Sequence, residues 1–326
     1  MEKVYYYPPL KGKEYRNPYS ANYRAALSDK YRIVNVRNRR AVALSLSFIF
    51  NAFRADVYII NWLENIGYRR FGSMQFLLVK LGLNVIRLRG KKIVWMFHNI
   101  HPHEGHSACS RWLHKYMFRN ASLIISHSME AADYARQRTE VKVLYVCHPV
   151  HVISLNDKGQ DVEACDVFIW GSIMPYKGVY EFLQEEAKRK AGLRIHILGR
   201  CNDSRLNENI KSLCSGRVTF DNRRAEFEEI AAYIKRSRYV LFPYVGSCVS
   251  SSGALIDTLV MGGTPVGPSV GAFSDLAKEG MCLTYHDYDG LFRTLQEKRS
   301  IEDRDRRDFI RRNSWERLVD VIGENL

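Results

Sequence analysis

The sequence has no hydrophobic run long enough to cross a membrane. No stretch of its 326 residues reaches the roughly 18 consecutive apolar residues that a membrane-spanning helix needs. The N-terminal sequence MEKVYYYPPLKGKEY also lacks the apolar central region of a secretory signal peptide. Hydrophobic residues still make up 46% of the chain, which is enough for ordinary cores. We therefore expect a globular protein of about two domains.

Cysteine is scarce and scattered. The seven cysteines never occur in the C-x-x-C spacing of a zinc or redox motif, and an odd number does not suit a disulfide framework. We therefore expect free thiols in a reducing compartment. These residues are Cys109, Cys147, Cys165, Cys201, Cys214, Cys248 and Cys282.

Two common phosphate-binding motifs are missing as well. There is no G-x-x-x-x-G-K-[ST] loop, and no G-x-G-x-x-G motif follows the first expected strand, Val4 to Tyr7. These absences exclude a P-loop nucleotidase and argue against a dinucleotide-binding domain.

Positive charge is in excess, but only in the first half of the chain. Residues 1–150 contain 24 Lys and Arg against 9 Asp and Glu, whereas residues 151–326 contain 25 against 26. The first half therefore carries all of the net charge of +14. A basic half of this kind implies an anionic partner, such as a phosphate-rich lipid, an anionic membrane surface or a nucleic acid.

Short apolar strands alternate with helices along the whole chain, which predicts an α/β protein with parallel sheets. A polar stretch over 149–163 interrupts the pattern, so we expect domains over 1–155 and 156–326. The charged stretch 302–326 reads as a terminal helix. The strands expected before the break cover 4–7, 31–36, 56–62, 93–97, 123–125 and 141–146, and those after it 167–170, 193–198, 217–220 and 239–242.

The segment 239–267, YVLFPYVGSCVSSSGALIDTLVMGGTPVG, reads as a strand, a small polar loop, a helix and another strand. A Ser/Gly loop that enters a helix presents free N–H groups and the positive end of the helix dipole to an anion. We expect an anion to bind at Ser251, Ser252, Gly253 and Ala254. The alternative is an ordinary serine-capped helix.

This segment resembles the donor-nucleotide segment of GT-B glycosyltransferases, close to the family-4 type of bacterial polysaccharide enzymes. The resemblance implies two Rossmann-like domains facing a central cleft, with a C-terminal helix that packs back on the first domain. Many members carry two glutamates here, and the matching positions are Ser250 and Thr258. Any role that depends on that acidic pair does not transfer to this chain.

A second segment, FIWGSIMPYKGVYEFL over 168–183, resembles the GT-B segment that gives an arginine and a lysine to the donor diphosphate. Lys177 matches the lysine, and Ser172 stands at the arginine position. Arg200, after the strand HIL, is a candidate to replace that arginine. The alternative for Lys177 is a lysine in solvent.

A third segment, FHNIHPHEGH over 97–106, resembles the strand-end histidine of family-4-like transferases. This assigns His98 to the reacting sugar or acceptor, with Asn99, His103 and Glu104 on the acceptor side. The histidine spacing does not give the H-E-x-x-H helix of a zinc protease, so we expect no metal there. A purely structural histidine remains the alternative. No D-x-D motif occurs in a setting that suggests a metal-dependent GT-A transferase.

The resemblance implies a retaining, metal-independent glycosyltransferase without a cofactor. Its donor would be a UDP- or GDP-linked sugar and its acceptor a lipid-linked glycan of bacterial surface polysaccharide. We expect it in the cytoplasm, at the inner face of the cell membrane. The alternatives are a GT-B sugar-nucleotide epimerase and a non-catalytic protein that binds nucleotide-sugars or nucleic acid, although the basic half has no recognisable nucleic-acid motif.

The segment 68–92, YRRFGSMQFLLVKLGLNVIRLRGKK, encloses an apolar stretch between basic residues. Such a segment can bury its apolar side in a membrane interface while its charges meet lipid phosphates. We predict docking on an anionic membrane through charges that include Arg69, Arg70, Arg89 and Lys92. The alternative is a core helix whose charges face water.

Overall fold

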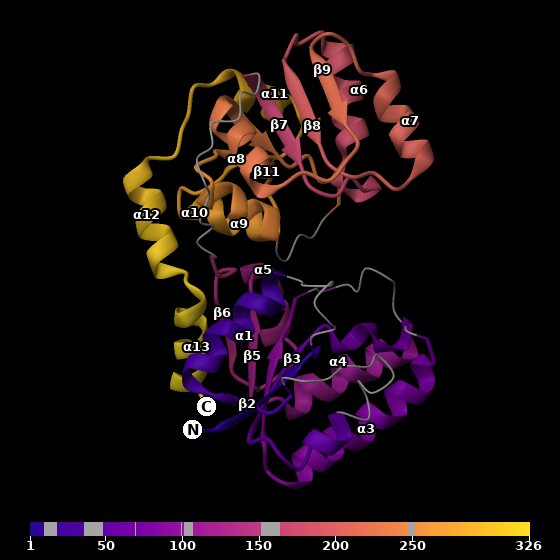
Figure 1. Cartoon of the computed structure of the whole chain (residues 1–326), viewed down its shortest axis with the longest axis vertical. Helices are drawn as coiled ribbons and strands as arrows, with labels where there is room; N and C mark the ends of the chain where they lie inside the picture. Colours follow the sequence, from indigo (N-terminus) through magenta and orange to yellow (C-terminus); the bar gives the residue numbers. More distant parts are fainter. Residues whose placement is uncertain are drawn as a thin grey trace. The chain divides into compact units, whose positions relative to one another are not determined.

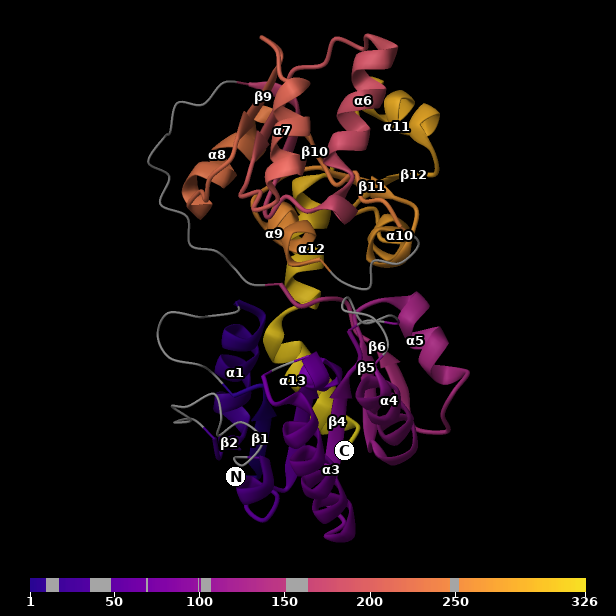
Figure 2. The ribbon, with the colours of Figure 1, turned by 90° about the vertical axis from the view of Figure 1, so that its right-hand side faces the viewer.

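The computed structural model describes residues 1–9, 18–35, 48–68, 70–98, 100, 107–150, 164–246 and 252–326. They form two compact units (Figures 1 and 2). Unit 1 is Met1–Pro149 together with Asn313–Leu326, and unit 2 is Val150–Arg312. Each unit has its own parallel sheet, so the α/β expectation is confirmed.

The sheet of unit 1 has the strand order β2-β1-β3-β4-β5-β6, and all neighbours run parallel. All five residues of β3 are buried, as expected for a parallel strand covered on both faces. The edge strand β2 pairs with β1 alone and is shorter than the predicted run 31–36. The strands are β1 (Lys3–Tyr7), β2 (Arg32–Ile33), β3 (Val57–Asn61), β4 (Lys92–Met96), β5 (Leu123–Ser126) and β6 (Val143–Tyr145).

Helices cover both faces of this sheet (Figure 1). Alternate residues such as Tyr6 and Ile59 pack against α1 and α13. On the opposite face, the Trp95 ring packs on Phe118 of α4, with 5.0 Å between ring centroids. The helices of this unit are α1 (Pro18–Lys30), the 3-10 helix η1 (Leu63–Tyr68), α3 (Gly72–Leu88), α4 (Ala108–Asn120), α5 (Met129–Arg136) and α13 (Trp315–Glu324).

The charged C-terminal stretch forms two helices instead of the single one expected. The first, α12 (Asp303–Arg312), belongs to unit 2, and α13 belongs to unit 1. Ser314 starts α13 because its side chain accepts a hydrogen bond from the Arg317 N–H at 3.2 Å. Trp315 and Leu318 of α13 are buried in the unit 1 core, which confirms that a terminal helix packs on the first domain.

The sheet of unit 2 has the order β12-β11-β10-β7-β8-β9, again with parallel neighbours. The chain moves outward from β7 to β9, crosses to β10 on the other side of β7, and moves outward again. The strand order therefore reverses between β7 and β10, and ligands bind at such a point, beyond the carboxyl ends of the strands. The strands are β7 (Cys165–Trp170), β8 (Ile195–Leu198), β9 (Val218–Asp221), β10 (Ser237–Leu241), β11 (Pro265–Pro268) and β12 (Leu283–Tyr285).

Helices also cover both faces of the unit 2 sheet. Ile169 and Ile197 share a core with Phe182 of α6. On the other face, Phe168 stacks on Tyr233 of α8 with 5.2 Å between ring centroids. The helices are the 3-10 helix η2 (Pro175–Lys177), α6 (Val179–Arg189), α7 (Ser204–Ser212), α8 (Phe227–Arg236), α9 (Gly253–Val260), α10 (Gly271–Lys278), α11 (Tyr288–Gln296) and α12.

Among the described residues, no helix is long and apolar enough to cross a membrane. The six cysteines in the described ranges are free thiols, and Cys248 lies outside these ranges.

Candidate functional site

In unit 2, the site lies where the loops after β7 and β10 meet. The Val245 N–H donates to the Tyr176 carbonyl at 3.0 Å, which ties the two loops together. Gly178 is required at this contact, because its φ is 65° and a Cβ there would lie 2.1 Å from the Pro243 carbonyl oxygen. The sheet's reversal point thus carries two closely packed loops.

Lys177 lies at this junction and is buried, with 9% of its surface exposed. Burial alone lowers the pKa of its ammonium group from 10.5 to about 8. Its Nζ lies 5.6 Å from the centroid of the Tyr244 ring, and no carboxylate of the described residues pairs with it. This excludes a lysine in solvent and leaves a buried positive charge that an anion would neutralise.

Tyr244 connects Lys177 to the start of α9. Burial raises the pKa of the Tyr244 hydroxyl to about 12, although a hydrogen bond with the Ser252 side chain has the opposite effect. The Ser252 side chain also caps α9 by accepting from the Leu255 N–H at 3.4 Å. Gly253 is exposed and Ala254 partly exposed at the start of this helix. An anion near Lys177 would therefore also meet a helix N-terminus.

A pocket of about 270 Å³ opens beside Tyr244. The loops after β10, β11 and β12 form it, so it too lies at the carboxyl edge of the sheet. Its lining is Pro243, Tyr244, Val245, Gly246, Pro268, Ser269, Val270, Tyr285, His286, Asp287 and Tyr288.

Ser172 and Arg200 lie in two loops that touch. A Cβ on Gly199 would lie 1.8 Å from the Gly171 carbonyl oxygen, and the Ile173 N–H donates to the Arg200 carbonyl at 2.9 Å. Both Ser172 and Arg200 are exposed. The Arg200 guanidinium donates to the Asn202 side chain at 2.8 Å. The structure thus brings the loops of Ser172, Lys177 and Arg200 together but holds the Arg200 side chain on its own loop.

Thr258, at one of the two positions where related transferases carry glutamate, is fully buried. Its hydroxyl accepts a hydrogen bond from the Trp170 indole N–H at 3.0 Å. This side chain is engaged in the core and supplies no acidic group to the site.

In unit 1, His98 is buried at the carboxyl end of β4 and stacks on Trp62, with 4.4 Å between ring centroids and 16° between ring planes. Its Nε2 lies 3.1 Å from the Asn61 side-chain oxygen. The Asn61 amide nitrogen donates to the Tyr7 carbonyl at 2.9 Å, so its oxygen must face His98. His98 Nε2 therefore carries the proton and Nδ1 holds a lone pair.

His127 and His148 follow β5 and β6 and pack near His98, and the sequence analysis missed both. The His127 Nδ1 donates to the Val146 carbonyl at 2.8 Å, so its Nε2 accepts from the Tyr19 hydroxyl at 2.7 Å. The sequence signal that could have found these two histidines is the position of each just after a short apolar strand. The carboxyl ends of neighbouring parallel strands meet at one edge of a sheet, so such residues gather there.

Burial keeps all three histidines neutral. Burial is the largest cause of the lowered pKa in each case, and the nearby histidines add to it at His98 and His127. The pKa falls well below 6.5 at His98, to about 3 at His127 and to about 4 at His148. His98 can therefore act as a neutral hydrogen-bonding group at physiological pH.

Trp62 has a strained backbone beside His98. Its φ of 49° lies in the left-handed region, where a bulky residue is an outlier. Such strain often occurs at functional sites, because a specific side-chain position is needed there. Here it accompanies an indole that lies flat against His98.

Four of the predicted site residues lie outside the described residues: Asn99, His103, Glu104 and Ser251. Within the described residues, no group of His, Cys, Asp and Glu could hold a metal ion.

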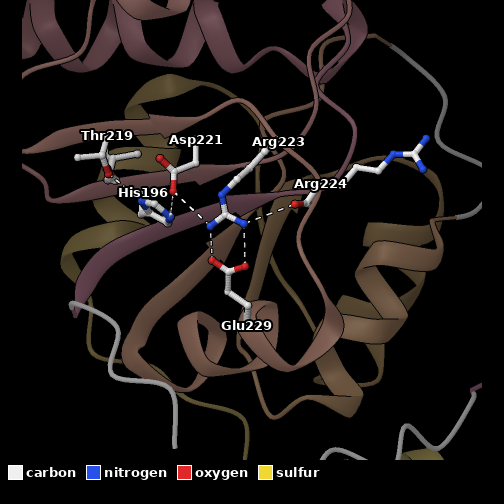
Figure 3. Close-up of polar contacts among 7 residues, drawn as sticks. His196, Thr219, Asp221, Arg223, Arg224 and Glu229 are labelled. Atoms are coloured by element: carbon white, nitrogen blue, oxygen red, sulfur yellow. Dashed lines mark hydrogen bonds and ion pairs between the residues drawn. The ribbon is translucent and has the colours of Figure 1, made fainter.

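Unit 2 contains a second polar cluster, on the face of the sheet next to α8 (Figure 3). The Arg223 guanidinium forms two hydrogen bonds with the Glu229 carboxylate, one of 2.8 Å, and lies 3.6 Å from Asp221. These bonds lower the pKa of Glu229. The charges of this cluster are paired with one another, unlike that of Lys177.

Solved structures of other proteins show the same fold. Neither the protein-family models nor the curated proteins gave a match. Among solved structures, Anabaena HepE in complex with UDP and glucose matches over 100% of both chains, with a TM-score of 0.69 and 12% identity. The chain has the GT-B fold. A glycosyltransferase from Rickettsia africae shares this GT-B fold, with a TM-score of 0.64 and 10% identity over 99% of this chain and 98% of that one. A trehalose-phosphate synthase from Burkholderia vietnamiensis also matches, with a TM-score of 0.64 and 10% identity over 99% of this chain and 97% of that one.

Proposed function

We propose that the protein is a glycosyltransferase that takes a sugar from a nucleoside-diphosphate sugar bound in unit 2. The observation that carries this proposal is the buried Lys177 ammonium, which has no carboxylate partner among the described residues and lies at the reversal point of a GT-B sheet. A diphosphate would supply the missing negative charge. HepE, which has the same fold, was solved with UDP-glucose, and this supports a nucleotide-sugar donor.

The reaction would break the bond between the anomeric carbon and a diphosphate oxygen. The bonding electrons leave with the diphosphate, and the acceptor oxygen forms the new bond while its proton passes to the departing diphosphate. Lys177, the start of α9 and Arg200 would stabilise the growing negative charge. A single electrostatic donor of this kind is worth about 3–4 kcal/mol of transition-state stabilisation.

We assign His98 to the reacting sugar or the acceptor hydroxyl. The hydrogen bond with Asn61 fixes one tautomer of its ring, and the ring stacks on Trp62. The ring stays neutral because burial lowers its pKa. The lone pair on Nδ1 suits it to accept a hydrogen bond from a hydroxyl group.

We further propose a retaining reaction without a metal and a lipid-linked glycan acceptor of bacterial surface polysaccharide, made at the inner face of the membrane. The support is the resemblance of segments 168–183 and 239–267 together with the basic first half of the chain. Nucleic acid is the less favoured partner, because no recognisable nucleic-acid motif accompanies the basic residues.

Calorimetric titration with UDP-, GDP-, ADP- and dTDP-sugars tests the donor site. We expect a UDP- or GDP-sugar to bind the native protein and to lose at least tenfold in affinity with Lys177→Met, because about 1.4 kcal/mol of charge stabilisation corresponds to tenfold. Unchanged affinity in this variant would place the donor elsewhere.

Product analysis separates the two rival functions. A transferase consumes the donor only with an acceptor, whereas an epimerase converts it without one, and a binding protein converts nothing. His98→Ala should abolish transfer and leave nucleotide affinity in unit 2 unchanged. If this variant fails to fold, the histidine has a structural role.

A further inference from the structure

A groove of about 550 Å³ lies between α3 and α4 of unit 1, and its lining includes none of the three buried histidines. Its α3 side consists of Lys80, Asn84 and Arg87, which share one helix face because they are spaced by four and three residues. The α4 side repeats this spacing. It consists of Trp112, Lys115, Tyr116, Arg119 and Asn120.

Four basic side chains line the groove without acidic neighbours on either helix. The sequences of α3 and α4 contain no Asp or Glu, and between residues 65 and 128 Glu104 is the only acidic residue. No ion pair joins any of the four to a described carboxylate. Elsewhere in unit 1 basic residues are paired, for example Lys91 with Asp56 at 2.8 Å. The groove therefore concentrates unpaired positive charge.

The floor of the groove is aromatic and well packed. Trp112 stacks on Tyr116 with 5.0 Å between ring centroids, and the Lys80 ammonium lies 5.2 Å from the Trp112 ring centroid. The Tyr116 hydroxyl donates to the Leu83 carbonyl at 2.9 Å. Aromatic side chains with a polar end are favoured at the boundary between lipid and water.

The solvent side of α3, next to the groove, is apolar. Met74, Leu77, Leu81 and Leu88 are 51%, 64%, 54% and 84% exposed. The helix uses a different face for the core, where Val79 is fully buried. Exposed apolar side chains gathered beside positive charge mark a surface that meets another apolar phase.

The charges that the sequence analysis assigned to docking are partly engaged within the protein. The Lys92 ammonium donates to the Leu326 carbonyl. The Arg89 guanidinium donates to the Ala52 carbonyl at 2.9 Å. Arg69 lies outside the described residues. Arg70 is exposed, so it remains a candidate lipid contact beside the basic residues of the groove.

We propose that this groove binds the phosphate of an anionic phospholipid headgroup while the exposed leucines of α3 enter the membrane interface. The occupant is an anionic membrane surface, because it alone offers both phosphate for the four basic residues and an apolar phase for Leu77 and Leu81. This proposal does not depend on the proposed glycosyl transfer.

Co-sedimentation of the full chain with vesicles tests it. Binding to phosphatidylcholine vesicles that contain phosphatidylglycerol should exceed binding to pure phosphatidylcholine, and salt should weaken it. K115E/R119E should reduce affinity at least tenfold, because it reverses two of the four charges that would meet lipid phosphate. K80Q/R87Q, on the facing helix, should show a loss in the same direction.

Three further variants complete the design. R205E/K211E reverses two exposed charges on α7 of unit 2 and should leave binding unchanged. L77S/L81S should weaken binding while keeping its salt dependence. Brominated lipids should quench the fluorescence of the native protein more than that of Trp112→Phe, because the indole would lie at the interface.

Three outcomes would overturn the proposal. They are absence of vesicle binding at low salt, equal losses in K115E/R119E and R205E/K211E, and binding of inorganic phosphate or a short RNA at the groove without vesicle binding. The last two ligands distinguish a free-phosphate or nucleic-acid site from a membrane surface.

Discussion

At the scale of single residues, Lys177 should stabilise the complex with an anionic ligand but lower the stability of the ligand-free folded protein. Its pKa falls from 10.5 to about 8, so keeping it charged in the ligand-free protein at neutral pH costs on the order of 3 kcal/mol. The Lys177→Met variant should therefore be at least as stable as the native protein while it loses nucleotide affinity. Residues selected for binding often lower the stability of the folded protein in this way.

The pH dependence of nucleotide binding should report on Lys177. Its folded pKa lies below the unfolded value, so the unfolded chain binds more protons between about pH 8 and 10.5 and the free energy of unfolding rises with pH in that window. Affinity for UDP should fall as pH rises above about 8, because the ammonium loses its proton. Lys177→Arg should bind with a flatter profile, since arginine stays charged.

Calorimetric titration of both proteins with the same nucleotide measures this difference, and the ionisation of the ligand cancels. Parallel profiles for the native protein and Lys177→Arg would show that another group controls binding.

At the scale of elements, the start of α9 is open enough for a decisive substitution. No atom of the described residues lies within 4 Å of a Cβ built on Gly253. Gly253→Val should therefore keep its melting temperature and lose UDP affinity, because the new side chain occupies the space of the phosphate. Calorimetry and thermal melting measure the two effects.

Gly216→Val is the matched control, since a Cβ there also meets nothing within 4 Å. It should affect neither stability nor binding. Full UDP affinity in Gly253→Val would argue against an anion at this helix.

The strands were predictable from sequence because both faces of each parallel sheet are buried, which leaves apolar runs such as the one ending at Trp170. The burial of Lys177 was not, because it depends on the tertiary contact between Gly178 and Pro243. His127 was missed for a related reason. A single histidine after a short strand resembles a loop residue until neighbouring strands bring it beside Tyr19.

At the scale of the whole molecule, unit 1 should lose more stability than unit 2 on acidification. In unit 1, His127 and His148 have pKa values of about 3 and about 4 against 6.5 unfolded, so their contribution to stability is lost as pH falls below 6.5. The pKa of Glu64, raised to about 7 by burial, partly offsets this loss. In unit 2, burial raises the pKa of Asp257 to about 6, so protonation of this carboxyl on acidification stabilises the unit and offsets the effect of Glu229, whose pKa is lowered by Arg223.

Unit 1 should therefore unfold first on acidification. Tryptophan fluorescence follows it, because four of the five tryptophans lie in unit 1 and Trp170→Phe removes the fifth. His148→Phe should reduce the dependence of unfolding free energy on pH by about 1.4 kcal/mol per pH unit between pH 4 and 6.5. An equal pH dependence in this variant would mean that His148 does not titrate on unfolding.

The path of the chain between the units has a consequence for the order in which they form on the ribosome. Residues 313–326 complete the core of unit 1, whereas unit 2 is one continuous segment. During synthesis, unit 2 can therefore fold before unit 1, although unit 1 is made first. The core of unit 1 is incomplete until Trp315 and Leu318 have been synthesised. A chain that stops at Arg312 should show protected amides in unit 2 and fast hydrogen exchange in unit 1. Equal protection in both units would show that α13 is dispensable for folding.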